Sequence, residues 1–160
     1  FLQQAVLASE DQRFLVHNGF DFNQIDKAIK ERARKKRLRG ASTITMQVAR
    51  NLFLWQGPSF TRKILEAYYT ILLEHLWSKG RILEVYLNIA EWGRGIFGAE
   101  AAARAYFNRP ASSLTRDQAA LLAAVLPNPR RWSPARPTSY ILKRKAFILK
   151  HMGTFRPLAP

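Results

Sequence analysis

The chain has 160 residues, of which 48% are hydrophobic and 23% are charged, so we expect one globular domain with a real core. It contains no cysteine, which excludes a disulfide framework, a thiol nucleophile and cysteine-ligated zinc. It also lacks an apolar run of about 18 residues that could span a membrane. The formal net charge of +15 indicates an anionic partner, which could be a nucleic acid, an anionic membrane or a phosphate-bearing substrate.

The hydrophobic pattern predicts an all-α protein with no strand and no internal repeat. About eight helices are expected, at residues 1–9, 20–38, 43–54, 61–77, 81–90, 97–107, 118–126 and 140–152. Hydroxyl side chains are the expected N-caps of three of them: Ser42, then Ser59 or Thr61, then Thr115. Residues 91–95 form a Gly-rich loop that matches neither a dinucleotide-binding nor a P-loop pattern. Because the chain begins at Phe1 without a methionine, we expect an upstream anchor or signal to be absent from it.

The helix at residues 20–38 begins as an amphipathic helix and becomes a basic run from Lys30 to Arg39. Like charges at this density repel one another, so we expect residues 20–40 to include a mobile segment unless an anion orders it. Residues 1–153 are expected to form the domain, with residues 154–160 as a fraying tail.

The helix at residues 61–77 is apolar nearly all round, which is typical of a buried helix. One polar stripe runs along it, because residues four apart share a face: Arg62, Glu66, Thr70 and Glu74. Lys63 lies within a turn of Glu66. A carboxylate with two cations at the buried start of a helix is either an internal salt bridge or part of a functional site.

The helix at residues 43–54 has one face of hydroxyl, amide and guanidinium groups, formed by Thr43, Gln47, Arg50 and Asn51. Such a face suits sugar hydroxyls and phosphate, although an ordinary surface face is equally compatible with it. Among the carboxylates, Glu10 ends an apolar helix with Arg13 as its only local cation, whereas Glu66 has Arg62 and Lys63. This asymmetry predicts one proton-accepting base and one anchored, ionised group.

Two carboxylates suggest sugar chemistry. A glycosidase needs an acid to protonate its leaving group, whereas transfer from a phosphate-activated donor needs one base and cations for the departing phosphates. The chain is rich in cations and poor in carboxylates, which favours transfer.

Four segments resemble, in order and spacing, the motifs of the peptidoglycan glycosyltransferase family. They are residues 10–14 (EDQRF) with His17 and Gly19, residues 40–51 (GASTITMQVARN), residues 62–66 (RKILE), and residues 79–88 (KGRILEVYLN) running on to Gly93. Residues 88–93 (NIAEWG) and 126–129 (LPNP) resemble the monofunctional, biosynthetic branch rather than the two-domain penicillin-binding proteins.

The resemblance implies a lysozyme-like fold with a larger lobe and a smaller, mobile, membrane-proximal lobe. It implies that the protein polymerises lipid II into glycan strands by inverting glycosyl transfer and releases undecaprenyl pyrophosphate. The place of action would be the outer, periplasmic face of the bacterial cytoplasmic (inner) membrane. The partners would be lipid II, the growing lipid-linked strand, the anionic membrane surface and other cell-wall synthesis proteins. No cofactor is expected, although Mg or Mn could stimulate the reaction through the lipid pyrophosphate.

The resemblance also implies a role for each matching residue. Glu10 would be the base for the acceptor hydroxyl, and Glu66 would be the second essential carboxylate. Pyrophosphate or sugars would contact Gln47, Arg50, Arg62 and Lys63. The cleft would be shaped by Asp11, Phe14, His17, Ser42, Thr43 and Asn51, and supported from behind by Arg81, Glu84 and Asn88.

Three positions depart from the family pattern. Arg50 stands where Lys is usual, which keeps the charge and adds a planar fork suited to phosphate. Met46 stands where many members have Gln, which suggests that this position faces the core. Pro58 stands where many members have Arg, which removes one expected phosphate contact.

Two other functions stay open. A helical nucleic-acid-binding domain would explain the charge but not a buried Glu66, and a lysozyme-like hydrolase would use Glu10 as an acid. The spacing of His17, His75 and His151 does not form a ligand cluster, so we expect a structural role for His17 and no metal site.

Overall fold

The computed structural model describes residues 1–34 and 41–159. Within them lie eight α-helices, two short 3₁₀ helices and one small sheet, so the all-α prediction is confirmed. The helices are α1 (Leu2–Glu10), α2 (Phe22–Ala33), α3 (Ile44–Phe53), α4 (Phe60–Leu76), α5 (Lys79–Ile89), α6 (Ala99–Phe107), α7 (Arg116–Val125) and α8 (Ser139–His151), with the 3₁₀ helices η1 (Ala111–Ser113) and η2 (Met152–Thr154).

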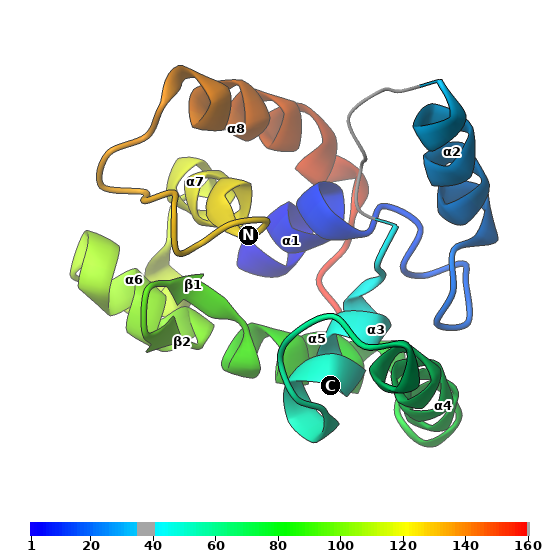
Figure 1. Ribbon diagram of the computed structural model, residues 1–160. Helices are drawn as coiled ribbons and strands as arrows, with labels where there is room; N and C mark the ends of the chain where they lie inside the picture. Colours follow the sequence, from blue (N-terminus) through cyan, green and yellow to red (C-terminus); the bar gives the residue numbers. More distant parts are fainter. Residues whose placement is uncertain (35–40, 160) are drawn as a thin grey trace.

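The core is built around α1, which lies at the centre of the molecule with α7 and α8 on one side and α3 and α5 on the other (Figure 1). Its residues Ala5, Val6 and Leu7 are fully buried. Helix α7 presents mainly alanines to this core, and small side chains allow close helix packing. The last residue of this central helix is Glu10, so the fold fixes the backbone of that residue firmly.

The expectation that the chain has no strand is wrong in one place. Strand β1 (Glu91–Gly93) pairs antiparallel with β2 (Ile96–Phe97), where the sequence predicts a loop followed by a helix from residue 97. The chain reverses its direction between the two strands at Gly95, whose φ of +74° is a conformation that glycine adopts readily. Gly98 has φ of +86°, and a Cβ there would lie 3.0 Å from the Asn88 carbonyl oxygen. Helix α6 therefore begins only at Ala99.

Helix ends agree with the predicted ends to within about two residues, except that α2 ends at Ala33. The Ser59 and Thr115 caps are confirmed. The cap of α3 is Thr43 rather than Ser42, since the Thr43 hydroxyl accepts from the Met46 amide. Met46 is half-buried, so the expectation that it faces the core is wrong; its neighbours Ile44 and Thr45 do so.

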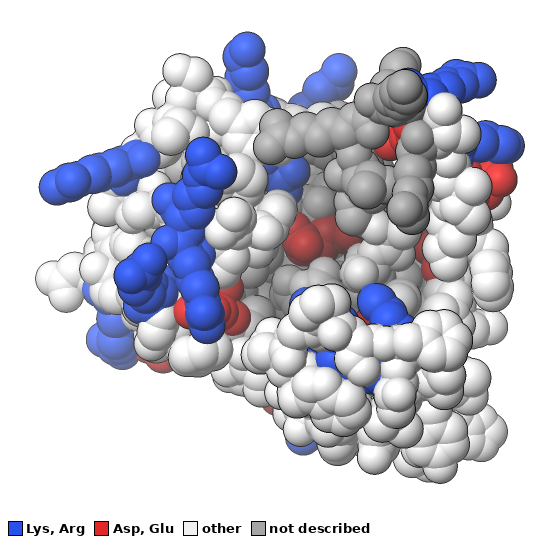
Figure 2. Space-filling model, in the orientation of Figure 1, with Lys and Arg blue, Asp and Glu red and all other residues white. Residues whose placement is uncertain are grey.

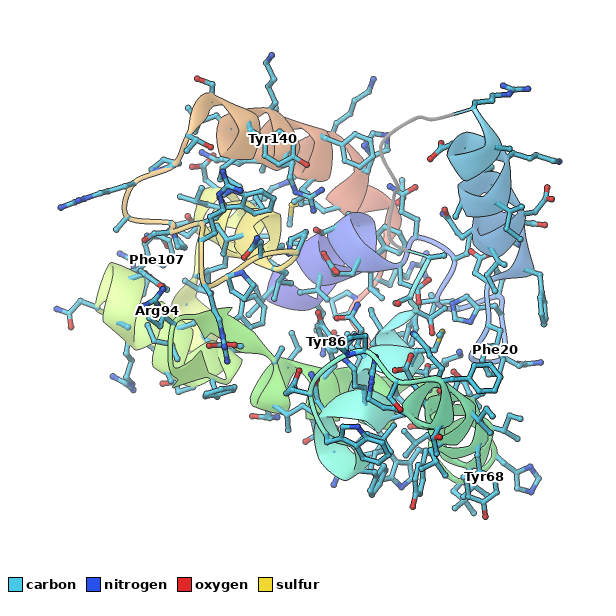
Figure 3. All side chains as sticks on the ribbon, viewed as in Figure 1. Phe20, Tyr68, Tyr86, Arg94, Phe107 and Tyr140 are labelled. Carbon is cyan, nitrogen blue, oxygen red and sulfur yellow. The ribbon has the colours of Figure 1, made fainter. Side chains whose placement is uncertain are left out.

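Helix α4 is not the buried helix that its composition predicts. Its apolar side faces outward, with Phe60 83% and Leu76 70% exposed, together with Ile64, Tyr68 and Ile71. Its polar stripe faces inward, so that Arg62, Glu66 and Thr70 are buried. The reason is that α4 packs along one side only, mainly against α3. Most of the surface over α3 and α4 carries no charged side chain, with a few Lys or Arg side chains visible on it (Figure 2), and Tyr68 points outward at its edge (Figure 3).

Helix α2 stands apart from the central helices (Figure 1). Asp21 caps it, because one carboxylate oxygen accepts from the amides of Asn23 and Gln24. The predicted basic run belongs to this helix as far as Ala33 and Arg34 follows in a turn, whereas residues 35–40 lie outside the described part of the chain. No helix in the described ranges has the length and apolar character needed to cross a bilayer.

The segment after Gly153, for which we expect fraying, lies against α1. The amide group of Gln3 bonds both the N–H and the C=O of Leu158, and Gln4 donates to the Phe155 carbonyl oxygen. Backbone groups that are satisfied in this way hold the segment in place.

Candidate active site

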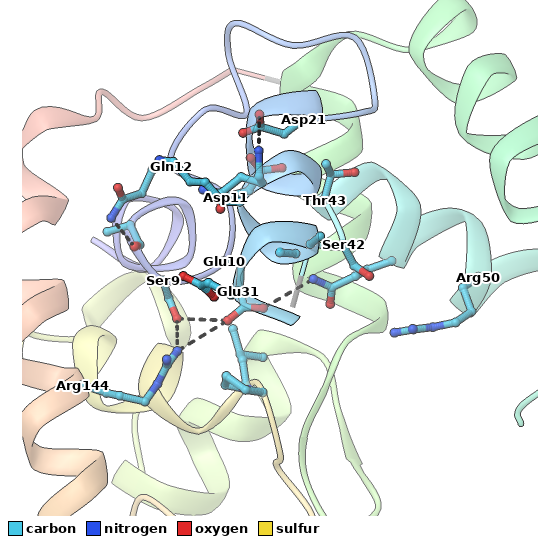
Figure 4. A pocket seen from close by; sticks show the side chains of 18 of the residues that line it. Ser9, Glu10, Asp11, Gln12, Asp21, Glu31, Ser42, Thr43, Arg50 and Arg144 are labelled. Atoms are coloured by element: carbon cyan, nitrogen blue, oxygen red, sulfur yellow. Dashed lines mark hydrogen bonds and ion pairs between the residues drawn. The ribbon is translucent and has the colours of Figure 1, made fainter. Parts of the chain in front are cut away.

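A cleft of about 530 Å³ lies between the end of α1, one face of α2, the start of α3, the loop after α7, and α8 (Figure 4). In Figure 2 it is a hollow in which acidic side chains are visible. Its predicted site residues are Glu10, Asp11, Ser42, Thr43, Gln47 and Arg50. It is also lined by residues that the sequence analysis does not single out, among them Ser9, Asp21, Gln24, Lys27, Glu31, Tyr140 and Arg144.

The Glu10 carboxylate is held at both oxygens. Its Oε1 accepts from the Ser9 hydroxyl at 3.0 Å, and the Arg144 Nη2 atom lies 3.8 Å away. Its Oε2 accepts from the Gln47 Nε2 atom at 3.4 Å. Burial raises the pKa of the Glu10 carboxyl above its usual value, whereas the Ser9 bond, the Arg144 charge and the Gln47 bond act in the opposite direction. A carboxylate of this kind can take a proton more readily than an exposed one.

The cation beside Glu10 is Arg144, not the sequence neighbour Arg13. Arg13 instead pairs with Asp21 at 2.9 Å. Arg144 belongs to α8 and reaches Glu10 only through the packing of α8 beside α1 and α7. Nothing in the local sequence pattern indicates this approach.

Gln47 is oriented by two contacts. Besides donating to Glu10, it accepts at Oε1 from the Tyr86 hydroxyl at 3.3 Å. Burial raises the pKa of Tyr86 well above its usual value, and the negative charge of Glu10 adds to this, so the hydroxyl stays a donor. Tyr86 on α5 therefore fixes which side of the Gln47 amide faces Glu10.

Asp11, His17 and Thr43 tie the loop after α1 to the start of α3. The Asp11 carboxylate accepts from His17 Nε2 at 2.9 Å and from the Ile44 amide at 3.1 Å. The Gly19 amide donates to His17 Nδ1 at 3.1 Å, and the Thr43 hydroxyl donates to the Gly19 carbonyl oxygen at 2.6 Å. His17 is buried in this network, which agrees with the expected structural role, and it does not line the cleft that the resemblance implies it would shape. Asp11 and Thr43 both line the cleft and hold its wall together.

Phe14 does not shape the cleft, contrary to what the resemblance implies. It is fully buried in the core, with the Lys79 ammonium 4.5 Å from its ring centroid. Lys79 also donates to the His17 carbonyl oxygen at 2.7 Å and to Glu74 at 2.8 Å. This contact links α5 to the loop that follows Glu10.

Glu66 lies outside this cleft and so do its two cations, as far as the described residues show. The side chain is 1% exposed, and its oxygens accept from Arg62 Nη1 and Lys63 Nζ at 3.0 Å each. The internal salt bridge considered in the sequence analysis is therefore present. The structure does not bring Glu66 and Glu10 to one cavity.

Four further predicted residues lie away from the cleft. Asn51 is exposed on α3 and does not line it. Arg81, Glu84 and Asn88 lie on the outer side of α5, where Arg81 pairs with Glu84 at 2.6 Å and Asn88 donates to the Glu84 carbonyl oxygen. They do not support the cleft directly, because α5 turns Ile82, Leu83 and Tyr86 inward instead.

No cluster of three or more His, Cys, Asp or Glu side chains suited to a metal ion occurs in the part of the chain that the structure describes. The cleft instead combines a desolvated carboxylate with the cations Lys27, Arg50 and Arg144. This arrangement can accept a proton from a neutral donor beside a bound anionic group.

A family model described as Transglycosylase matches residues 1–153. The chain is 60% identical over 148 residues to the biosynthetic peptidoglycan transglycosylase of Chromohalobacter salexigens, covering 92% of this chain and 63% of that protein. It is 55% identical over 152 residues to the protein of the same name from Aeromonas hydrophila, covering 95% and 65%. It is 56% identical over 155 residues to the protein of the same name from Rhodospirillum centenum, covering 97% of this chain and 67% of that protein.

The chain thus spans 63%, 65% and 67% of the length of these relatives, which is less than two thirds for the first two. The match extends over nearly all of the described helices, from α1 to α8. The resemblance of the four motifs is thereby confirmed, and the chain belongs to the transglycosylase family, with its lysozyme-like, all-α fold.

Proposed function

We propose that this chain polymerises lipid II into peptidoglycan glycan strands by inverting glycosyl transfer, with release of undecaprenyl pyrophosphate. The observation that carries the proposal is the Glu10 carboxylate, which is desolvated and held at both oxygens in a cleft that also contains Arg50, Lys27 and Arg144. The names of the relatives, biosynthetic peptidoglycan transglycosylases, support the same reaction.

In the proposed reaction, the 4-hydroxyl of the acceptor N-acetylglucosamine attacks the anomeric carbon of the donor N-acetylmuramic acid. The new C–O bond forms as the bond to the pyrophosphate oxygen breaks, and the pyrophosphate leaves with the electron pair. Glu10 takes the hydroxyl proton. Burial raises the pKa of Glu10, whereas Ser9, Arg144 and Gln47 act in the opposite direction, so the ionised carboxylate is a stronger base than an exposed one.

Cations would stabilise the departing pyrophosphate. Arg50 lies in the cleft and is suited to this role by its planar fork. The resemblance assigns Arg62 and Lys63 to the same role; Glu66 holds both of them, but they lie outside the cleft that contains Arg50. No resident cofactor is proposed; Mg or Mn would act through the lipid pyrophosphate.

We further propose that the chain works at the outer face of the bacterial cytoplasmic membrane, with other cell-wall synthesis proteins as partners. The largely apolar outer side of α4 would form part of a membrane-proximal lobe together with the exposed Phe22 of α2. Each basic side chain near a surface of anionic lipids contributes about 1 kcal/mol to the attraction between protein and membrane. The net charge of +15 would supply this attraction.

A lipid II polymerisation assay tests the proposed reaction. Wild type should form glycan strands and Glu10→Gln none, at equal folding by circular dichroism. The polymerisation activity of Glu66→Gln, measured in the same assay, tests whether the second carboxylate is essential. Cleavage of existing glycan without polymer would instead favour hydrolysis with Glu10 as an acid, and an active Glu10→Gln would exclude Glu10 as the base.

A further inference from the structure

We propose that Arg144 of α8 is a positioning residue, which acts through the Ser9 hydroxyl to orient the Glu10 carboxylate and favour its ionised form. This inference rests on the proposed function only in one of its two tests, the measurement of polymerisation activity. The geometry that carries it is a chain of contacts from the C-terminal helix to the end of α1 (Figure 4).

The guanidinium of Arg144 is anchored on the end of α7. Its Nε donates to the Ala124 carbonyl oxygen at 3.1 Å, one of the carbonyls that a helix leaves without an intrahelical partner at its C-terminus. Its Nη2 donates to the Ser9 hydroxyl oxygen at 2.9 Å. The planar fork of arginine allows both bonds at once, which an ammonium group on a flexible stem cannot reproduce in the same geometry.

The Ser9 hydroxyl has one proton and two acceptors within reach. Glu10 Oε1 lies at 3.0 Å and the Ala123 carbonyl oxygen at 3.1 Å. Bonds to a charged acceptor are the stronger ones, so the hydroxyl donates to Glu10 when that carboxylate is ionised and can turn to Ala123 when it is neutral. Donation from Arg144 into the hydroxyl oxygen polarises the O–H bond further. Ser9 thereby relays the charge of Arg144 to Glu10.

Other charged and titratable groups also face Glu10, and none of them duplicates this contact. Asp11 follows it in the chain and opposes its ionisation. The others lie on the elements around the cleft: Asp21 before α2, Lys27 and Glu31 on α2, Arg50 on α3, Tyr86 on α5, and Tyr140 on α8. Arg144 is the cation that the ion-pair geometry places beside Glu10 among the described residues.

The direct test is the titration of Glu10 by carbon NMR of carboxyl-labelled protein, assigned with Glu10→Gln. Arg144→Gln and Ser9→Ala should both move the titration of Glu10 to higher pH. The double variant should move it by less than the sum of the two, because both residues act through one oxygen. Lys143→Gln removes the same charge from the exposed side of α8 and should leave the titration where it is.

The second readout is the pH profile of lipid II polymerisation. On the acidic limb, Arg144→Gln should be at least roughly threefold less active than wild type while approaching it at high pH, since a lost opposite charge disfavours the ionised base. Arg144→Lys should restore part of this loss. If Arg144→Gln is folded and the titration of Glu10 in it does not move, the inference is overturned, even if the variant still polymerises lipid II. A moved titration in a protein without polymerase activity would refute the proposed function alone.

Discussion

Arg62 Nη1 lies 3.0 Å from Glu66 Oε2, and both side chains are buried on the inner face of α4. Lys63 binds the other oxygen from a position that is half exposed. The carboxylate therefore neutralises a buried guanidinium, and a buried charge that loses its partner is costly. This pair has to be considered whenever Glu66 is tested for a catalytic role.

We expect Glu66→Gln to lower the free energy of unfolding by about 3 kcal/mol, because it leaves Arg62 buried without an opposite charge. Urea denaturation followed by circular dichroism measures this. Glu84→Gln is the matched control: it breaks the Arg81–Glu84 pair, whose side chains are 51% and 37% exposed, and should cost less than about 1 kcal/mol. Equal effects of the two substitutions would contradict the structural role of Glu66.

Gly19 is required where the loop after α1 crosses α4. Its φ is +87°, and an added Cβ would lie 2.7 Å from the Thr70 Cγ2 atom. Gly57 has φ of +104° but open space around its Cα. Gly57→Ala should therefore lower the free energy of unfolding by about 1 kcal/mol, through backbone strain alone. Gly19→Ala should lower it by the same amount and by roughly 1–3 kcal/mol more, because the added Cβ overpacks the contact with Thr70. Thermal unfolding of both variants compares them, and a Gly19→Ala no less stable than Gly57→Ala would rule out the close contact.

Glu10 should lower the stability of the fold at neutral pH. Burial raises its pKa in the folded protein above the value of an exposed carboxyl, so the folded state binds the proton more tightly than the unfolded state does. The protonated carboxyl thus favours the folded state relative to the ionised one. This stabilisation is fully present at pH values below the pKa of Glu10 in the unfolded chain, and it is lost as the pH rises through the pKa in the folded protein. We expect Glu10→Gln to be more stable than wild type at pH 7 to 8, and this gain to shrink toward pH 4.

Unfolding in urea at several pH values tests that expectation. Asp26→Asn is a suitable control, since Asp26 is exposed and pairs with Lys30 on the surface of α2. A stability difference between Glu10→Gln and wild type that stays constant from acid to neutral pH would show that desolvation of Glu10 is not its cause.

The sequence predicts the helices well because their capping and hydrophobic signals are local. Thr115, for example, forms the expected cap together with Gln118. Motif residues such as Glu10 and Gln47 also meet in the cleft as expected. The caps depend on spacing along one helix, which a sequence displays directly, whereas the meeting of Glu10 and Gln47 was expected from the family resemblance.

Three features could not be predicted in this way. The composition of α4 predicts a helix that is buried all round, Glu66 included, but it does not show that the polar face alone turns inward while the apolar side is exposed. The approach of Arg144 to Ser9 joins the two ends of the chain, and it follows from helix packing. The β1–β2 hairpin was missed because two strands of this length carry almost no alternating pattern.

The exposed apolar side of α4 provides the last prediction. Ile64, Tyr68 and Ile71 are each more than half exposed at spacings that place them on one helix face. If this face enters the headgroup region of a bilayer, replacing all three by Ser should weaken binding to anionic vesicles at least tenfold, since each buried side chain of this size contributes about 1.5 kcal/mol or more. Folding should be unchanged, because exposed side chains contribute little to stability.

Sedimentation with vesicles measures the binding, and Leu142→Ser with Phe147→Ser on α8 is the control, since both side chains are exposed on a different helix. Raising the salt concentration separates the two contributions: it screens the attraction of the basic surface but leaves apolar insertion in place. Wild type should therefore retain part of its binding at high salt, and the α4 variant should lose nearly all of it. Equal binding of the α4 variant and the α8 control at high salt would exclude α4 as the membrane-facing helix.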